Sequence, residues 1–151
     1  MMKKPIKNIE GVTLLEIMLV LAIASMVIVM SIRYYQNATN AQNTNVVMEE
    51  IQNLTAAADN LAQGSGSYSQ FGGSAQVIAV AGASNLKTPF ATTITTSGFG
   101  PNGYAVTVPL GTTSGSSAVC AAVAAKLASN KKYTAATCNN GTVTYTYNAT
   151  S

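Results

Sequence analysis

The 151-residue sequence has no histidine, only two cysteines, and few charged side chains: eight Lys and Arg residues and five Asp and Glu residues. Histidine is the commonest general base in enzymes, and no glycine-rich phosphate loop follows a predicted strand. We therefore expect that the chain is not an enzyme. Without histidine or a second pair of cysteines, the chain lacks the ligands that complete a zinc shell, so we also expect no metal and no cofactor.

The few charges also argue against nucleic acid as a partner. The net charge is +3, but residues 1–11 carry three Lys and one Glu, so the rest of the chain is close to +1. Lys131 and Lys132 are a weak electrostatic footprint for DNA. We interpret them as part of a solvated loop, with a DNA contact as the alternative. The acidic residues Glu49, Glu50 and Asp59 are predicted to lie on the solvated face of a helix.

The most distinctive stretch present is the apolar run from Val12 to Ile32, VTLLEIMLVLAIASMVIVMSI. It is long enough to span a bilayer, contains no Gly or Pro, and is apolar on every side, unlike a surface helix. Its single ionisable residue is Glu16, and a charge within such a span costs about 2.5–3.5 kcal/mol. Glu16 therefore needs a partner from another chain or an amine created by cleavage; the alternative is that it lies near the membrane surface and is solvated.

The residues before this run carry Lys3, Lys4 and Lys7. A basic segment ahead of an apolar span places that end in the cytoplasm. A secretory signal peptide is a poor interpretation, because the apolar run exceeds the usual core of about 7–15 residues and no small-residue cleavage site follows it.

The segment GVTLLEIMLVLAI, from Gly11 to Ile23, resembles the processing site of type IV pilins and pseudopilins. The resemblance implies that a prepilin peptidase cuts after Gly11 and that the new amine of Val12 is N-methylated. It also implies that Glu16, fifth from Val12, pairs with the terminal amine of a neighbouring Val12 during assembly. Val12 in place of the usual Phe is typical of type IVb pilins, and the chain resembles a type IVb major pilin most. The short leader and the small mature chain, however, are not typical of type IVb pilins.

Helical periodicity continues beyond the apolar run. Apolar residues recur at spacings of three and four, as expected for one buried helix face; they are Val47, Ile51, Leu54, Ala58 and Leu61. We predict one helix from Val12 to about Gln63, ended by Gly64, with an apolar half at 12–33 and an amphipathic half at 34–63. A flexible linker at Tyr34–Asn45 is the alternative, since Asn is a poor helix former.

Residues 64–151 are predicted to form a globular α+β head, in which the long helix packs on a small antiparallel sheet with one extra helix. The loop is predicted at Gly64–Gly73, and Ser116 or Ser117 is expected to cap the short helix. Its buried face is predicted to contain Val119, Val123 and Leu127. The expected strands are Gln76–Val80, Thr92–Thr96, Tyr104–Val108 and Thr142–Tyr147.

Cys120 and Cys138 are expected to form a disulfide, because the head would lie in an oxidising compartment beyond the membrane. The bond should stabilise the head by about 3 kcal/mol and clamp the short helix to the last strand. The alternative is a pair of reduced, buried thiols.

The pilin resemblance implies a structural subunit that begins in the inner membrane and ends in an extracellular filament, or fimbrium, used for adhesion, aggregation, motility or DNA uptake. The implied partners are further copies of the chain, the prepilin peptidase and N-methyltransferase, and the pilus assembly platform. The alternatives are a minor pilin or type II secretion pseudopilin, and a membrane-tethered adhesin or DNA-binding head.

Overall fold

The computed structural model describes residues 13–71, 74–82 and 87–150. The chain divides into two units with their boundary between Asn37 and Ala38. The first described helix, α1, comprises Leu14–Ser65. Gly11 and Val12, the predicted cleavage and methylation sites, lie outside the described residues.

Helix α1 begins after Thr13, whose carbonyl oxygen accepts hydrogen bonds from the backbone N–H groups of Glu16 (3.0 Å) and Ile17 (3.3 Å). The predicted end at Gly64 is wrong. The helix ends instead before Gly66, which has a φ of 76° and donates its N–H to the carbonyl oxygen of Ala62 at 2.7 Å. This left-handed conformation is one that glycine adopts readily at helix ends.

The asparagine-rich stretch Tyr34–Asn45 is helical throughout, so the flexible-linker alternative is wrong. The stretch contains neither Gly nor Pro, the two residues that most strongly oppose a helix interior. The modest cost of its asparagines is small enough for the helix to continue through them.

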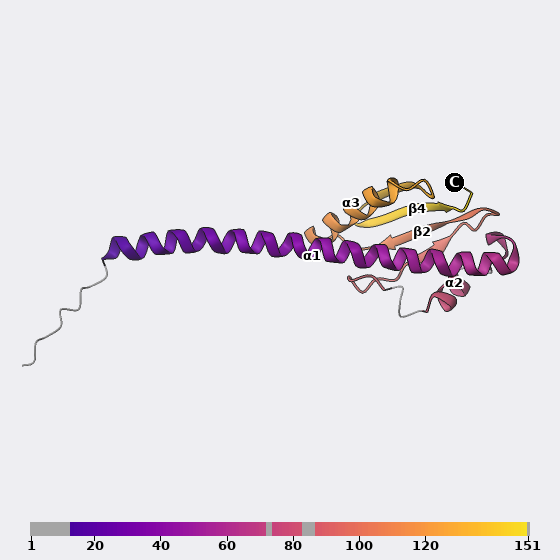
Figure 1. Cartoon of the computed structure of the whole chain (residues 1–151), viewed down its shortest axis with the longest axis horizontal. Coiled ribbons are helices and arrows are strands. Elements are labelled where there is room, and N and C mark those ends of the chain that lie inside the picture. Colours follow the sequence, from indigo (N-terminus) through magenta and orange to yellow (C-terminus); the bar gives the residue numbers. More distant parts are fainter. Residues whose placement is uncertain (1–12, 72–73, 83–86, 151) are drawn as a thin grey trace, which may run out of the picture. The chain divides into compact units, whose positions relative to one another are not determined.

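The second unit is an α+β head, as predicted. Its antiparallel sheet has the strand order β1-β2-β4-β3. Residues Val47 to Ala62 of α1 contribute to the core that covers one face of that sheet (Figure 1). The strands are β1 (Thr95–Ser97), β2 (Gly103–Pro109), β3 (Tyr133–Asn139) and β4 (Thr142–Asn148). The remaining helices are η1 (Tyr68–Gln70), α2 (Ser74–Ala81) and α3 (Ser114–Ala128).

Two of the predicted strands are confirmed as β2 and β4, where alternate side chains are buried. The strand expected at Thr92–Thr96 begins later and is only three residues long, as β1. The strand expected at Gln76–Val80 is wrong, because these residues belong to α2. A short apolar run does not distinguish a strand from a helical turn by its pattern alone. Within this helix Val77 is fully buried in the core.

Strand β3 was not predicted, because its sequence YTAATCN shows no alternation. It pairs only with β4 at the edge of the sheet. The register shifts between Thr134 and Thr137, and Ala135 within this irregularity has a φ of 53°. Bulges of this kind are common at sheet edges, where they interrupt further strand pairing.

The core confirms the predicted helix faces. On α1, Val47, Ile51, Leu54 and Ala58 are fully buried, and Leu61 packs against them while partly exposed. The predicted face of α3 is also fully buried, with Val119, Val123 and Leu127. The sheet contributes Tyr104, Val106, Val108, Val143, Tyr145 and Tyr147 to the same cluster.

The cap predicted for the short helix is wrong by one turn. Helix α3 is capped by Thr113, whose hydroxyl oxygen accepts the N–H of Ser116 at 3.4 Å. Ser116 is fully buried and donates its hydroxyl to the carbonyl oxygen of Gly111 at 2.7 Å. Its side chain therefore ties the first turn to the preceding loop.

Candidate functional site

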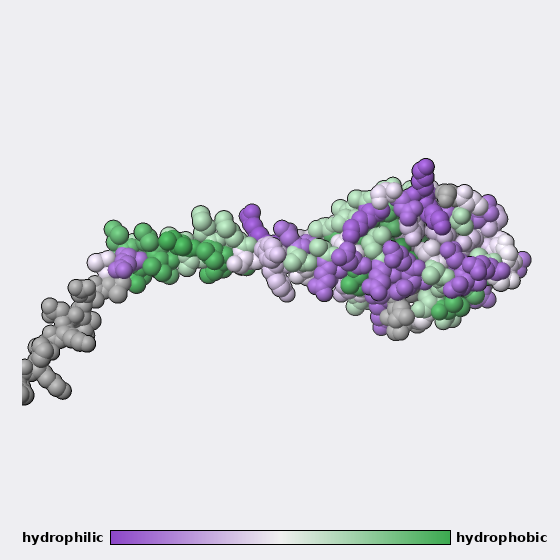
Figure 2. Space-filling model, viewed as in Figure 1, coloured by the Kyte–Doolittle hydropathy of each residue, from purple (hydrophilic) through white to green (hydrophobic). Residues whose placement is uncertain are grey.

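The first unit presents an apolar surface with no cover. Every large hydrophobic side chain between Leu14 and Ile32 is exposed, from 49% at Ile17 to 77% at Leu14, and Figure 2 shows this part of α1 as predominantly hydrophobic. Among the described residues, α1 is the one helix long and apolar enough to cross a membrane. Exposed apolar surfaces of this extent mark sites of contact with a membrane or with another protein.

The two serines of this apolar segment are already satisfied within the helix. Ser25 donates its hydroxyl to the carbonyl oxygen of Ala22, and Ser31 donates to that of Val27, both at 2.8 Å. Serine commonly masks its polarity in this way inside helices. Neither serine therefore opposes an apolar environment strongly.

Glu16 is the chemically distinct residue of this segment. It lies in the first turn of α1, and its backbone N–H is 3.4 Å from the Thr13 hydroxyl oxygen. A carboxylate there is favoured by the helix dipole, by about 0.3–1 kcal/mol at an exposed site. Arg33 is the only cationic side chain in residues 13–37, and it lies about 26 Å further along the helix at about 1.5 Å per residue. Among the described residues of this segment, 13–37, Glu16 thus has no cationic side chain within reach.

The expected disulfide is present between Cys120 and Cys138, with the Cα atoms 5.7 Å apart, so the reduced-thiol alternative is wrong. One correction concerns the partner strand. Cys120 lies on α3, but Cys138 lies on β3, which is an edge strand and not the last strand of the chain. The bond therefore clamps the short helix to a strand at one edge of the sheet.

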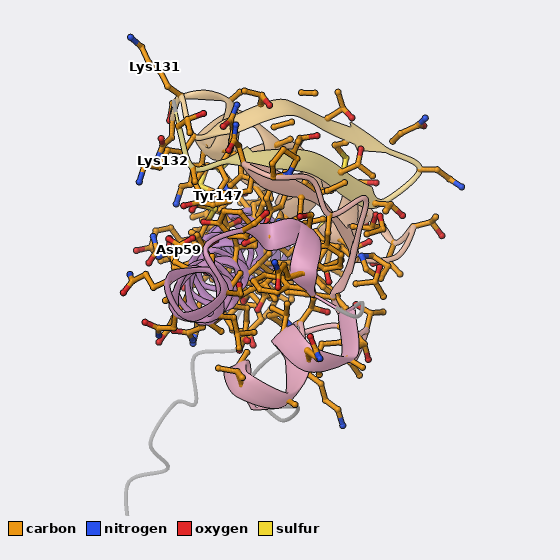
Figure 3. All side chains as sticks on the ribbon, turned by 90° about the vertical axis from the view of Figure 1, so that its right-hand side faces the viewer. Asp59, Lys131, Lys132 and Tyr147 are labelled. Atoms are coloured by element: carbon orange, nitrogen blue, oxygen red, sulfur yellow. A yellow bond between two sulfur atoms is a disulfide. The ribbon has the colours of Figure 1, made fainter. Side chains whose placement is uncertain are left out.

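Asp59 does not lie on a solvated face, contrary to the prediction. It accepts hydrogen bonds from the phenol of Tyr68 at 2.5 Å and the phenol of Tyr147 at 3.0 Å. Figure 3 shows Asp59 on α1 and Tyr147 on the sheet directed toward each other. One carboxylate thus joins α1, η1 and β4. The helical periodicity gave no signal for this contact, because Asp59 lies about 100° around the helix axis from Ala58 on the predicted buried face.

The tyrosines around Asp59 form an aromatic cluster. The ring centroids of Tyr104 and Tyr147 are 5.3 Å apart, and those of Tyr68 and Tyr104 are 5.6 Å apart. Burial, and then the hydrogen bond to Asp59, raises the pKa of Tyr147 to about 12. Burial is also the main cause that raises the pKa of Tyr68, Tyr104 and Tyr145. All four phenols therefore stay neutral at physiological pH.

These tyrosines predict a loss of stability in alkali. An unfolded tyrosine ionises near pH 10, whereas Tyr147 in the folded head ionises near pH 12. The folded state therefore retains protons that the unfolded state has lost, and its stability falls as pH rises. We expect the urea midpoint of the purified protein to be level below about pH 9 and to fall steeply between about pH 10 and 12. Tyr147→Phe should show a shallower fall, and an equal slope in both proteins would contradict this account.

The other charged residues differ in their surroundings. Glu49 is exposed, as expected. Glu50 departs from the prediction, because its side chain is half-buried. This burial, and then the charge of Glu49, raises the pKa of Glu50. Lys131 and Lys132 are exposed between α3 and β3, as Figure 3 shows for Lys131, which confirms the solvated loop. Within the described residues, no group of three His, Cys, Asp or Glu side chains is placed to hold a metal ion.

Comparisons of the chain with protein-family models, with curated proteins and with solved structures find no match. The fold itself is a long helix with an apolar N-terminal half, packed on a small antiparallel sheet with a disulfide. That combination is consistent with a pilin-like fold.

Proposed function

We propose that the chain is the precursor of a type IV pilin-like filament subunit, of the type IVb major pilin kind. In this proposal the peptidase removes residues 1–11, Val12 is N-methylated, and the apolar segments of many copies pack together as the filament core. The observation that carries it is an apolar half-helix, exposed on all sides, with one carboxylate in its first turn.

The physical argument concerns Glu16. In lipid, an uncompensated carboxylate is costly, and a partner charge relieves that cost only when it lies close by. An α-amine has a pKa near 7.7–8.0, so the processed amine of Val12 is largely cationic at neutral pH. Docking of a subunit beside another subunit's Val12 amine therefore supplies a cation that the side chains of residues 13–32 do not provide.

The proposal also gives the chain its place and partners. The precursor is held in the inner membrane by the apolar segment, where the prepilin peptidase and N-methyltransferase process it. The assembly platform then moves it into an extracellular filament, and the disulfide-closed head forms the filament exterior. The small, neutral side chains of the head suit a solvent-exposed structural role.

The direct test is electron microscopy of fibres sheared from the cell surface, with mass spectrometry of their subunit. We expect abundant fibres whose subunit begins with N-methylated Val12 and carries the Cys120–Cys138 bond. Fibres in which the subunit keeps residues 1–11 would refute the proposal. A processed subunit found only in trace amounts would instead favour a minor pilin or pseudopilin.

Replacing Gly11 by alanine should block processing, because the resemblance places the cut directly after this glycine. The expected product is a full-length chain that stays in the membrane fraction and forms no fibre. Intact-mass measurement of membrane-extracted protein checks this, with Gly64→Ala as a matched control, since a Cβ at Gly64 meets open space. Normal mature protein from the Gly11 variant would exclude the peptidase assignment.

A further inference from the structure

Three residues with large side chains that end in hydrogen-bonding groups follow the apolar segment directly: Arg33, Tyr34 and Tyr35. All three are exposed, with 78% of Tyr34 and 72% of Tyr35 accessible. Successive residues of an α-helix are about 100° apart around its axis, given 3.6 residues per turn. The three side chains therefore fan around more than half of the helix circumference as a belt.

The length of the apolar segment decides where this belt lies in a bilayer. Leu14–Ile32 is about 28 Å long at about 1.5 Å per residue, and the hydrocarbon core of a bilayer is about 30 Å thick. When this segment spans the core, Arg33, Tyr34 and Tyr35 reach the headgroup layer at the C-terminal end of the segment. The next residues, Gln36 and Asn37, are polar and suit the water beyond.

The side chains match the chemistry of that layer. Tyrosine has an apolar ring and a polar hydroxyl, and it concentrates at membrane–water interfaces. The guanidinium of arginine presents a planar set of donors that binds a phosphate through two parallel hydrogen bonds. If the partner of these side chains were another helix, we would expect one apolar stripe along α1. A belt that surrounds the helix and includes a cation matches lipid headgroups better.

We propose that Arg33, Tyr34 and Tyr35 form a phospholipid-headgroup binding belt that sets the depth of the precursor in the membrane. This inference rests on the proposed membrane stage of the pilin-like precursor. The belt holds Arg33 at phosphate level, and Glu16, about 26 Å along the helix at about 1.5 Å per residue, at the opposite edge of the hydrocarbon core. There its carboxylate lies close to water and to the surface at which Val12 would be released.

Because the sequence has no tryptophan, the fluorescence of one introduced tryptophan reports the depth of that position alone. Single-tryptophan variants Ile23→Trp and Tyr34→Trp of the full chain are placed in vesicles of phosphatidylethanolamine and phosphatidylglycerol. The lipids carry bromine at shallow or deep acyl positions, and iodide in the water serves as the aqueous quencher. We expect deep bromines to quench Ile23→Trp best and shallow bromines to quench Tyr34→Trp best.

The function of the belt is tested with Ile23→Trp as the reporter. Adding Tyr34→Ser, Tyr35→Ser and Arg33→Gln should shift its quenching toward shallower labels, because the helix is then free to slide. If Arg33→Lys replaces Arg33→Gln in this variant, the reporter should recover part of its original depth in the bilayer, because a cation remains at position 33. The matched control is Gln36→Ser with Asn37→Ser, which changes two adjacent residues outside the belt and should leave the profile unchanged.

The outcomes separate this inference from the proposed function. If only iodide quenches Tyr34→Trp while deep bromines still quench Ile23→Trp, the belt is wrong and the membrane stage stands. If removal of the belt leaves the Ile23→Trp profile unchanged, the depth-setting role is wrong. If no lipid label quenches Ile23→Trp, the membrane stage of the proposed function is itself wrong.

Discussion

Replacing Glu16 by alanine should yield a subunit that is processed and held in the membrane but does not enter a filament. The substitution removes a charge from the edge of the apolar span, where its cost is below the value of about 2.5–3.5 kcal/mol for a charge at the helix centre, so membrane retention should be kept or slightly increased. It also removes the group that the Val12 amine of a neighbour would bind. The unassembled subunit then lacks the electrostatic attraction that favours its move from lipid into the filament. It also lacks the contact that would set its axial register. Fibre yield by electron microscopy, beside the amount of processed protein in membranes, measures the two effects separately.

Two variants control this experiment. Glu16→Gln keeps the shape and removes the charge, so it should fail like alanine if the charge matters. Ser25→Ala removes a polar group from the same segment, but that hydroxyl is bonded to the carbonyl oxygen of Ala22 within the helix, so assembly should be normal. If Glu16→Ala assembled as well as Ser25→Ala, the carboxylate would have no register role, for example because each chain neutralises Glu16 with its own amine.

Removing the disulfide should produce a large loss of stability in the head. The two cysteines are separated by 18 residues, and closing such a loop is worth about 3 kcal/mol in the chain-entropy model. The loss should concentrate at β3, which pairs only with β4 and has an irregular register. Without the bond, only this pairing and the packing of α3 hold the edge strand.

The suitable variant is Cys120→Ala with Cys138→Ser, because Cys120 is fully buried and a hydroxyl there would add a cost of its own. We expect urea unfolding in detergent to show a free energy lower by about 3 kcal/mol, with faster amide exchange in β3 and α3 than in β2. Reduced wild-type protein is the matched control and should behave alike. An unchanged midpoint in both would mean that packing alone secures this edge.

Much of this fold was predictable because its signals are local. Helix α1 follows from an uninterrupted apolar run and then from the three-and-four spacing of Val47, Ile51 and Leu54. Strands β2 and β4 follow from strict alternation, which predicts one buried and one exposed face. The disulfide followed from there being only two cysteines in a head assigned to an oxidising compartment.

The candidate site was predictable only in part, for the same reason. The apolar segment and its lone carboxylate, Glu16, are visible in the sequence, because each is defined by its immediate neighbours. The structure adds that every large side chain of this segment is exposed and that both serines bond within the helix. Cleavage after Gly11 and methylation of Val12 stay predictions.

The sequence by itself therefore determined the apolar half-helix, the buried faces of α1 and α3, and the two alternating strands, because each is a repeat read over neighbouring residues. Only the tertiary structure decided that Gln76–Val80 is helical, that Cys138 lies on an edge strand, and that Asp59 meets Tyr147 across 88 residues of chain. These outcomes depend on contacts between segments far apart in sequence. Such contacts leave no periodic pattern, because the energy that selects them comes from packing against the rest of the head.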